Sequence, residues 1–424
     1  MFLIFIMPLV AVAQNEKGIQ FQRGMSWAQV KSKAKEENKY IFLDCFATWC
    51  GPCKKMDKEV YISDTVGKYM NARFISVKVQ IDTSGNDNDE IKKWYAAARE
   101  IKNEYWINSV PTYLFFSPEG IVVHKDIGSR GINGFISIAS SALKSDMQYF
   151  TLLENYKKGE RVYPVMPDLA KNTRRFGEKT LASQIAMDYI DNYLNKLSEG
   201  DFLKKDNVAF IWSFPETIKS NDRICNLCQY SPKRIDSVMG VGYSEKIIDY
   251  IISRDEVTLV VNVAKIQSKT PNWDRLFHQI KQKYGAENAE RNILVAKTEF
   301  YRERKDWKSY TKYLVQEVER ELSQDNVVGL KGSYYLNDMA WPVFQYSNDR
   351  NELSKALSWS NLSLKLDSTS LNAPNTMDTK ANLLYKMGKK EDAIAVEEKA
   401  AIMSPQSKVI QNSLEKMKKS KPTW

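Results

Sequence analysis

The stretch that decides the fold is YIFLDCFATWCGPCK, residues 40–54. Its first seven residues form a short apolar run typical of a buried strand, and the cysteine motif that follows contains a proline suited to the first turn of a helix. Strand, cysteine pair and helix therefore follow one another without a gap. We expect Cys50 to lie at the exposed helix start, where unpaired backbone amides and the helix dipole stabilise a thiolate and lower its pKa.

Alternating strand and helix signals on both sides of this stretch predict one mixed α/β domain. Ser26 is a good N-cap for a first helix, and the turn residues at 117–120 predict a hairpin. Strands are expected at residues 40–46, 73–81, 113–116 and 121–124, and helices at residues 26–38, from residue 50, at 91–101 and at 132–143. The expected order of elements is α, β, α, β, α, β, β, α.

A lone Cys-x-x-Cys pair is ambiguous among redox chemistry, half of a zinc site and coincidence. A zinc site needs two further soft or imidazole ligands, and the only histidines, His124 and His278, lie in unrelated segments. We interpret both as ordinary surface or core residues. The position of the pair between a strand and a helix favours redox chemistry, without a metal or an organic cofactor.

Residues 19–145 resemble the thioredoxin family, because several separated positions agree with its pattern. The letters WCGPCK at residues 49–54 match the family's active-site motif in full. By this resemblance Cys50 and Cys53 form a redox-active disulfide, in which Cys50 is the attacking thiol and Cys53 the resolving thiol. The resemblance places the substrate-binding surface around this pair, on Trp49, Gly51, Pro52, Val110 and Pro111.

Three further segments agree with the family pattern. Asp44, six residues before Cys50, falls where the family keeps a buried carboxylate that relays a proton to the resolving cysteine. Lys78 and Asp82 fall where its Lys-x-x-x-Asp segment ends the next strand. Pro111 falls on the family's cis-proline, which packs beside the disulfide and helps to bind substrate backbone. The resemblance thus implies a thioredoxin-like α/β domain, with a central mixed sheet flanked by helices, and adds Asp44 and Lys78 to the catalytic set.

The chemistry expected of Asp44 agrees with that role. Burial raises the pKa of a carboxyl group, Lys78 would moderate the rise, and Asp44 could then accept a proton from Cys53. A satisfied polar residue of the core is the alternative. Cys45, the next residue on the strand, should point to the opposite side and be a buried, inert thiol.

A second Cys-x-x-Cys pair, Cys225 and Cys228, lacks the tryptophan, glycine, proline and preceding strand of the first. Its surroundings favour a helix. Incidental cysteines, a local disulfide and a second redox relay are the alternatives. We expect this pair to be dispensable for disulfide exchange.

The chain is too long for one core, and two or three domains are expected. Residues 1–13 are an apolar run ending in Ala-Val-Ala, which fits signal-peptide cleavage and is too short to span a bilayer; a buried first strand is the alternative. Strand signals nearly vanish after residue 145. We predict a signal peptide at residues 1–13, a thioredoxin-like domain at 14–145, a helical domain at 146–325 and tetratricopeptide-like helical repeats at 326–424.

The last of these segments contains an internal echo. Three positions reappear at the same spacings: Ala356, Ser363 and Ser368 as Ala393, Ala400 and Pro405. Residues 375–405 resemble a tetratricopeptide repeat, a helix pair with small residues at close contacts, and Ala340 would open the first copy. Because only about two repeats are visible, they should stack on the preceding helices.

The charge pattern argues against nucleic acid as a partner. The net charge is +10, but the lysines are scattered among acidic residues, and no aromatic-basic motif is present. The expected partners are instead protein thiols or disulfides, an unidentified upstream electron donor and a protein bound to the helical repeats.

We interpret the chain as an exported thiol-disulfide oxidoreductase, periplasmic or secreted, that acts on proteins as a reductase or isomerase. The alternative is a helical-repeat binding or scaffold protein in which the thioredoxin-like fold is a docking module with little turnover. The intact cysteine pair with Asp44 and Pro111 favours the enzyme. The helical region should select the substrate without helping the chemistry.

Overall fold

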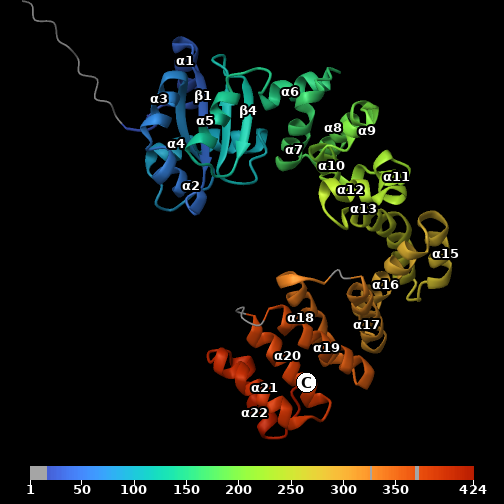
Figure 1. Cartoon of the computed structure of the whole chain (residues 1–424). Helices are drawn as coiled ribbons and strands as arrows, with labels where there is room; N and C mark the ends of the chain where they lie inside the picture. The colour runs from blue at the N-terminus through green and yellow to red at the C-terminus, as the bar shows by residue number, and fades with distance from the viewer. Residues whose placement is uncertain (1–16, 325–326, 368–371) are drawn as a thin grey trace, which may run out of the picture. The chain divides into compact units, whose positions relative to one another are not determined.

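The computed structural model describes residues 17–324, 327–367 and 372–424. The chain divides between Thr217 and Ile218 into two compact units. The sheet lies in the first unit, and outside it the described residues form helices and the loops that connect them (Figure 1). The signal peptide predicted at residues 1–13 lies outside the described residues, and the boundaries predicted at residues 145 and 325 stay predictions.

Four strands form the sheet in the order β2-β1-β3-β4. Their bounds are β1 Tyr40–Phe46, β2 Phe74–Gln80, β3 Thr112–Phe116 and β4 Val122–Ile127. Strand β1 runs parallel to β2 and antiparallel to β3, and β3 and β4 form the predicted hairpin. The strand prediction is therefore confirmed in number and type. β4 extends three residues beyond its predicted end.

Helices cover both faces of the sheet, and one of them was not predicted. Their bounds are α1 Trp27–Glu37, α2 Gly51–Lys55, α3 Asp64–Arg73, α4 Asp89–Glu104 and α5 Ile132–Ser141. After α2 the chain makes a π-helical turn at Met56–Val60 and then bends before α3. Ser63, the N-cap of α3, has the extended backbone that starts the new helix, with φ −68° and ψ 130°.

Strand β1 separates two hydrophobic cores. Cys45 belongs to the core beneath α1 and α4, whereas Phe42 belongs to the core beneath α3 and α5. Because side chains alternate along a strand, Asp44 shares the face of Phe42. Cys45 is fully buried, and burial raises the pKa of its thiol. The prediction of a buried thiol on the face opposite Asp44 is confirmed, and its inertness stays a prediction.

Further helices continue the first unit beyond the sheet: α6 Tyr149–Lys157, α7 Met166–Arg175, α8 Lys179–Asn192, α9 Glu199–Phe202 and α10 Lys205–Trp212. Helix α6 packs on β4, as Figure 1 shows. The Tyr149 amide donates a hydrogen bond to Nδ1 of His124 at 3.1 Å. Burial lowers the pKa of His124 to about 4, so the neutral ring can accept this bond.

The second unit is helical throughout the part that the structure describes. Its helices are α11 Arg223–Tyr230, α12 Pro232–Met239, α13 Tyr243–Ile252, α14 Thr258–Ile266, α15 Trp273–Tyr284, α16 Ala286–Glu303, α17 Trp307–Ser323, α18 Gly329–Tyr346, α19 Arg350–Leu366, α20 Ala373–Lys386, α21 Lys390–Met403 and α22 Lys408–Lys418. None of the helices described is long and apolar enough to cross a membrane.

Successive helices of the second unit pack as pairs, notably α18 with α19 and α20 with α21. The alanines of the predicted echo, Ala340, Ala356, Ala393 and Ala400, are all fully buried. These small side chains are therefore part of the packed interior of the helical region. Ser368 lies outside the described residues, and the tetratricopeptide identity of these pairs stays a prediction.

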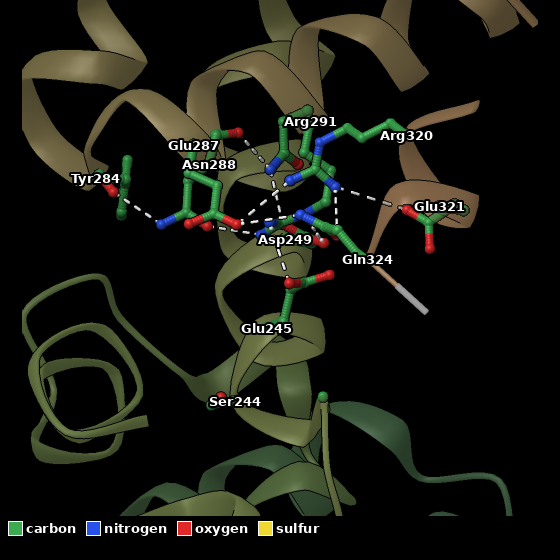
Figure 2. A network of polar contacts seen from close by, with 12 residues as sticks. Ser244, Glu245, Asp249, Tyr284, Glu287, Asn288, Arg291, Arg320, Glu321 and Gln324 are labelled. Atoms are coloured by element: carbon green, nitrogen blue, oxygen red, sulfur yellow. Dashed lines mark hydrogen bonds and ion pairs between the residues drawn. The ribbon is translucent and has the colours of Figure 1, made fainter. Parts of the chain in front are cut away.

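A polar network around a buried arginine joins three helices of the second unit (Figure 2). Arg291 on α16 is 6% exposed and binds Asp249 on α13 through two nitrogens, Nε at 2.8 Å and Nη2 at 2.6 Å. Glu245, one turn earlier on α13, lies 3.2 Å from Nη1. Arg320 of α17 extends the network to Glu287 of α16 at 3.5 Å. Removing one partner of such a desolvated pair would leave a buried charge, so the network fixes how these helices pack.

A pair of buried carboxyl groups lies between α20 and α21. Glu397 is fully buried and Asp378 is 5% exposed, and the two groups lie within hydrogen-bonding reach. Neither oxygen of Glu397 receives a hydrogen bond from a donor. Two carboxylates cannot both stay charged there, so burial raises the pKa of Glu397 well above its ordinary range and the pair shares a proton.

This pair predicts a stability that falls as pH rises. The folded protein retains a proton that the unfolded chain releases above the ordinary glutamate pKa of 4.5. The free energy of unfolding should therefore decrease above that pH, by up to about 1.4 kcal/mol per pH unit. Urea unfolding at several pH values, with amide exchange in α20 and α21 as the local readout, measures the slope. Glu397→Gln should flatten it and Glu391→Gln, at an exposed position of α21, should not; equal slopes in both variants would contradict the assignment.

Candidate functional site

The cysteine pair lies where the chain passes from β1 into α2. Cys50 is the N-cap of α2 and forms a disulfide with Cys53, with a Cα–Cα distance of 5.3 Å. The Cys53 amide donates to the Cys50 sulfur at 3.1 Å. Pro52 occupies the first turn of the helix, where its missing amide hydrogen costs nothing. The predicted strand, cysteine and helix sequence is confirmed, and a backbone amide points at the sulfur that must carry charge.

Cys50 is less accessible than the sequence suggested. The prediction of an exposed helix start is wrong for the oxidised protein, because Cys50 is 1% exposed and Cys53 3%. Both pack in a small apolar cluster with Ala47, against which Val110 is also packed. The disulfide closes Cys50 into this cluster. Trp49 next to it is 72% exposed, and so offers the largest accessible side chain beside the disulfide.

The second segment at the disulfide is the proline loop, residues 105–111. The Val110–Pro111 peptide bond is cis, as the resemblance implied. The Pro111 carbonyl accepts a hydrogen bond from the Gly128 amide at 2.8 Å, and Thr112 Oγ1 donates to the Ser109 carbonyl at 2.7 Å. The structure thus brings Val110 to the cysteine pair. The substrate-binding roles predicted around them stay predictions.

Asp44 is buried in the sheet, on the strand that leads to the cysteines. It is 1% exposed, and burial raises the pKa of its carboxyl to about 7. Lys78 opposes that rise from the neighbouring strand β2, with Nζ 3.7 Å from Asp44 Oδ2. Asp44 Oδ1 receives no hydrogen bond. A carboxylate that titrates near neutrality, with an oxygen free of donors, can accept a proton.

The surroundings of Asp44 include groups that the sequence reasoning missed. Asp57 forms an ion pair with Lys78 on the solvent side, and its negative charge adds to the rise in the pKa of Asp44. The hydroxyl groups of Tyr61 and Tyr113 are buried near it, and burial raises the pKa of both phenols. Asp57 and Tyr61 follow Cys53 at intervals of four residues, so helical spacing from the motif was the signal that could have found them.

Asp82 has a role different from that of Lys78. Its carboxylate accepts hydrogen bonds from the Thr48 amide, at 3.0 Å, and from Thr48 Oγ1, at 2.6 Å. Thr48 lies two residues before Cys50. Asp82 therefore anchors the turn that presents the cysteine motif.

The second cysteine pair has none of these features. Cys225 and Cys228 lie on α11, are 1% and 4% exposed, and carry free thiols in this structure. Burial raises the pKa of Cys225 to about 12, and its sulfur donates to the Lys219 carbonyl at 3.0 Å. A thiol of this kind is a poor nucleophile at neutral pH. Among the described residues, no cluster of three or more histidine, cysteine, aspartate or glutamate side chains could hold a metal ion.

Comparison with known proteins agrees with this site. Residues 27–131 match the family model of a thioredoxin-like domain. The chain is similar to thioredoxin Asp f 29 of Aspergillus fumigatus, at 29% identity over 24% of this chain and 76% of that protein. It is also similar to the thiol:disulfide interchange protein DsbD of Actinobacillus pleuropneumoniae, at 26% identity over 29% of this chain, but it spans only 19% of that relative's length.

A similar solved structure is a putative disulphide-isomerase from Bacteroides thetaiotaomicron. It is 28% identical, with a TM-score of 0.26, and the match covers 30% of this chain and 96% of that one. The family match and the paired cysteines identify the N-terminal part of the chain as a thioredoxin-like domain with the centre of a protein-disulfide oxidoreductase. An all-helical region follows it.

The pKa of Asp44 predicts how disulfide exchange depends on pH. Asp44 can accept the Cys53 proton only when it is deprotonated, so resolution of a mixed disulfide should accelerate as pH rises through about 7. Asp44→Asn should slow resolution by about a hundredfold and remove this step from the pH profile. Stopped-flow measurement of product release from a mixed disulfide on Cys50 tests both effects. An unchanged profile in the variant would exclude Asp44 as the proton acceptor.

The buried, free thiols of Cys225 and Cys228 predict that they take no part in exchange. Changing both to Ser should leave the rate of insulin reduction within about twofold of the unchanged protein, because neither thiol ionises near neutrality. Cys50→Ser is the matched comparison and should abolish the reaction. A comparable loss in the double variant would reveal a second redox relay.

Proposed function

We propose that this thioredoxin-like protein is an exported oxidoreductase that exchanges disulfides with protein substrates through Cys50 and Cys53, as a reductase or isomerase. The observation that carries the proposal is the joint placement of three groups. The disulfide closes at the start of α2, Asp44 lies buried on the strand that leads to it, and Val110 of the proline loop packs against it.

In the reducing direction the reduced protein reacts in two steps. The Cys50 thiolate attacks a substrate disulfide and forms a mixed disulfide, while the other substrate sulfur leaves as a thiolate. Asp44 then takes the proton of Cys53, whose thiolate attacks the Cys50 sulfur and releases the second substrate thiolate. Two electrons pass to the substrate, and the protein is left with the Cys50–Cys53 disulfide seen here.

Turnover as a reductase requires an electron donor that returns this disulfide to the dithiol. Such a donor would be a dithiol protein, because thiol-disulfide exchange needs no other cofactor. The similarity to an interchange protein supports a partner of this kind. Export, with the signal peptide at residues 1–13, would place the reaction in a compartment where substrate disulfides persist.

The helical region offers a place for a protein partner. Helix pairs stacked in series present extended surfaces, and in repeat proteins these surfaces bind other proteins. We propose that the helices of the second unit hold the substrate or a scaffold partner while the N-terminal domain performs the exchange. A protein of little turnover that uses the thioredoxin-like fold for docking is the competing function.

The unequal roles of the two cysteines predict a trapping variant. Cys53→Ala should still capture substrates through Cys50 but should not release them, because the resolving thiol is missing. Non-reducing gels of cell fractions, followed by mass spectrometry, should show adducts on Cys50.

The double variant Cys50→Ser, Cys53→Ala is the control and should collect none. Should the trap remain empty and the purified protein fail to reduce insulin, the docking function would replace the enzymatic one.

A further inference from the structure

A buried lysine links the proline loop to the helices that follow the sheet. Lys125 on β4 is 5% exposed, and a buried ammonium group is costly unless its hydrogens are paired. Its Nζ donates to the backbone oxygens of Tyr105, at 2.7 Å, and Trp106, at 3.3 Å. Phe176, which ends α7, places its ring centre 4.9 Å from the same nitrogen. The ring therefore covers the lysine that holds the start of the proline loop.

The other end of the proline loop is supported by Arg175, the last residue of α7, which directly precedes Phe176. Arg175 Nη1 lies 2.6 Å from Asp126 Oδ1, and its Nη2 donates to the Ile127 carbonyl. The amide of Gly128, the first residue after β4, donates to the Pro111 carbonyl at 2.8 Å. Arg175 thus fixes the end of β4, and Gly128, which follows that end, holds Pro111.

The start of the loop has a backbone conformation that needs such support. Trp106 has a φ of +49°, in the left-handed region that a bulky residue rarely adopts, and its side chain is 70% exposed. An exposed side chain gives little packing energy to hold this conformation. Strained backbone persists only where surrounding contacts over-determine it. The end of α4 supplies one such contact, because the Ile107 amide donates to the Lys102 carbonyl at 2.9 Å, and the two hydrogen bonds from Lys125 add to it.

A cleft of about 630 Å³ lies beside these contacts. Trp106 and Asn108 line it from the loop, and Phe176, Glu178 and Leu181 line it from the junction of α7 and α8. On this side the loop is exposed to the cleft and not packed tightly against α8. Support from the helices therefore reaches the loop chiefly through Lys125 and through β4.

We propose that the end of α7, through Arg175 and Phe176, is a positioning element of the redox site that fixes the proline loop for binding of a polypeptide substrate. This inference rests on the proposed function. It departs from the expectation that the helical region contributes only to substrate selection. Helices beyond residue 145 would belong to the exchange site itself, although they carry none of its reacting groups.

The test compares a protein disulfide with a small one in the full chain. Phe176→Leu removes the ring over Lys125 and keeps an apolar side chain, and Lys125→Met removes the hydrogen bonds and keeps the length. Each should lower the second-order rate constant of the reduced protein with insulin by about three- to tenfold. The rate constant with hydroxyethyl disulfide should stay within about twofold, because a small disulfide does not need the loop backbone.

Two further variants separate positioning from general damage. Phe176→Tyr keeps the ring and should retain the rate with insulin. Phe214→Leu makes the same change at a fully buried phenylalanine of the same unit, whose ring lies 3.9 Å from the Arg174 guanidinium, and should not change the ratio of the two rate constants. Unfolding curves check that each variant is folded. If Lys125→Met does not fold, the comparison of Phe176→Leu with the unchanged protein is the test.

Two results would overturn the inference: an unchanged ratio in Phe176→Leu, or an equal loss with both disulfides. The proposed function fails in a different way. In that case the unchanged protein reacts with neither disulfide, and the variants have nothing to alter.

Discussion

Strand β1 is hydrogen-bonded on both sides, to β2 and to β3, and the reacting groups are placed relative to it. Its register sets Asp44 opposite Lys78 on one side and Tyr113 on the other. A shift of one residue would exchange Asp44 with Cys45 and move the carboxyl to the wrong face of the sheet. The same register brings Pro111, which precedes β3, to the end of β1 where α2 starts. Pairing of the sheet thus determines which proton acceptor and which loop the cysteines meet.

The two units each bury a carboxyl group, with opposite consequences. Asp44 has Lys78 on its solvent side, so its charge is opposed only in part and its pKa lies near neutrality. Glu397 lies against another acid, Asp378, and the pair must keep a proton. The surroundings of Asp44 suit proton transfer, because both of its protonation states are accessible near neutral pH. The pair of Glu397 and Asp378 instead stabilises the packing of α20 on α21 only at a pH low enough for the shared proton to stay bound.

The sequence predicted those features that local pattern encodes. The strand run at residues 40–46, the hairpin and the helix start at the cysteines all have short-range signals, and the family motif added Asp44 and Pro111. The bend before α3 was missed because apolar residues continue on both sides of it. Burial of Cys50 was missed because it depends on Val110, sixty residues away in the chain. Contacts of that kind follow from the fold and leave no trace in local spacing.

The role of the first helices beyond the sheet follows from the position of β4. It is an edge strand, and an uncovered edge offers unpaired backbone groups to other chains. Helices α6 and α7 cover it, and their contacts bury His124, Lys125 and Asp126, side chains that a sheet edge in water would leave solvated. A chain that ended at residue 145 would expose these groups and release the ring from Lys125. The thioredoxin-like domain and the helices up to α7 therefore form one structural element, in which protection of the edge and support of the proline loop are the same set of contacts.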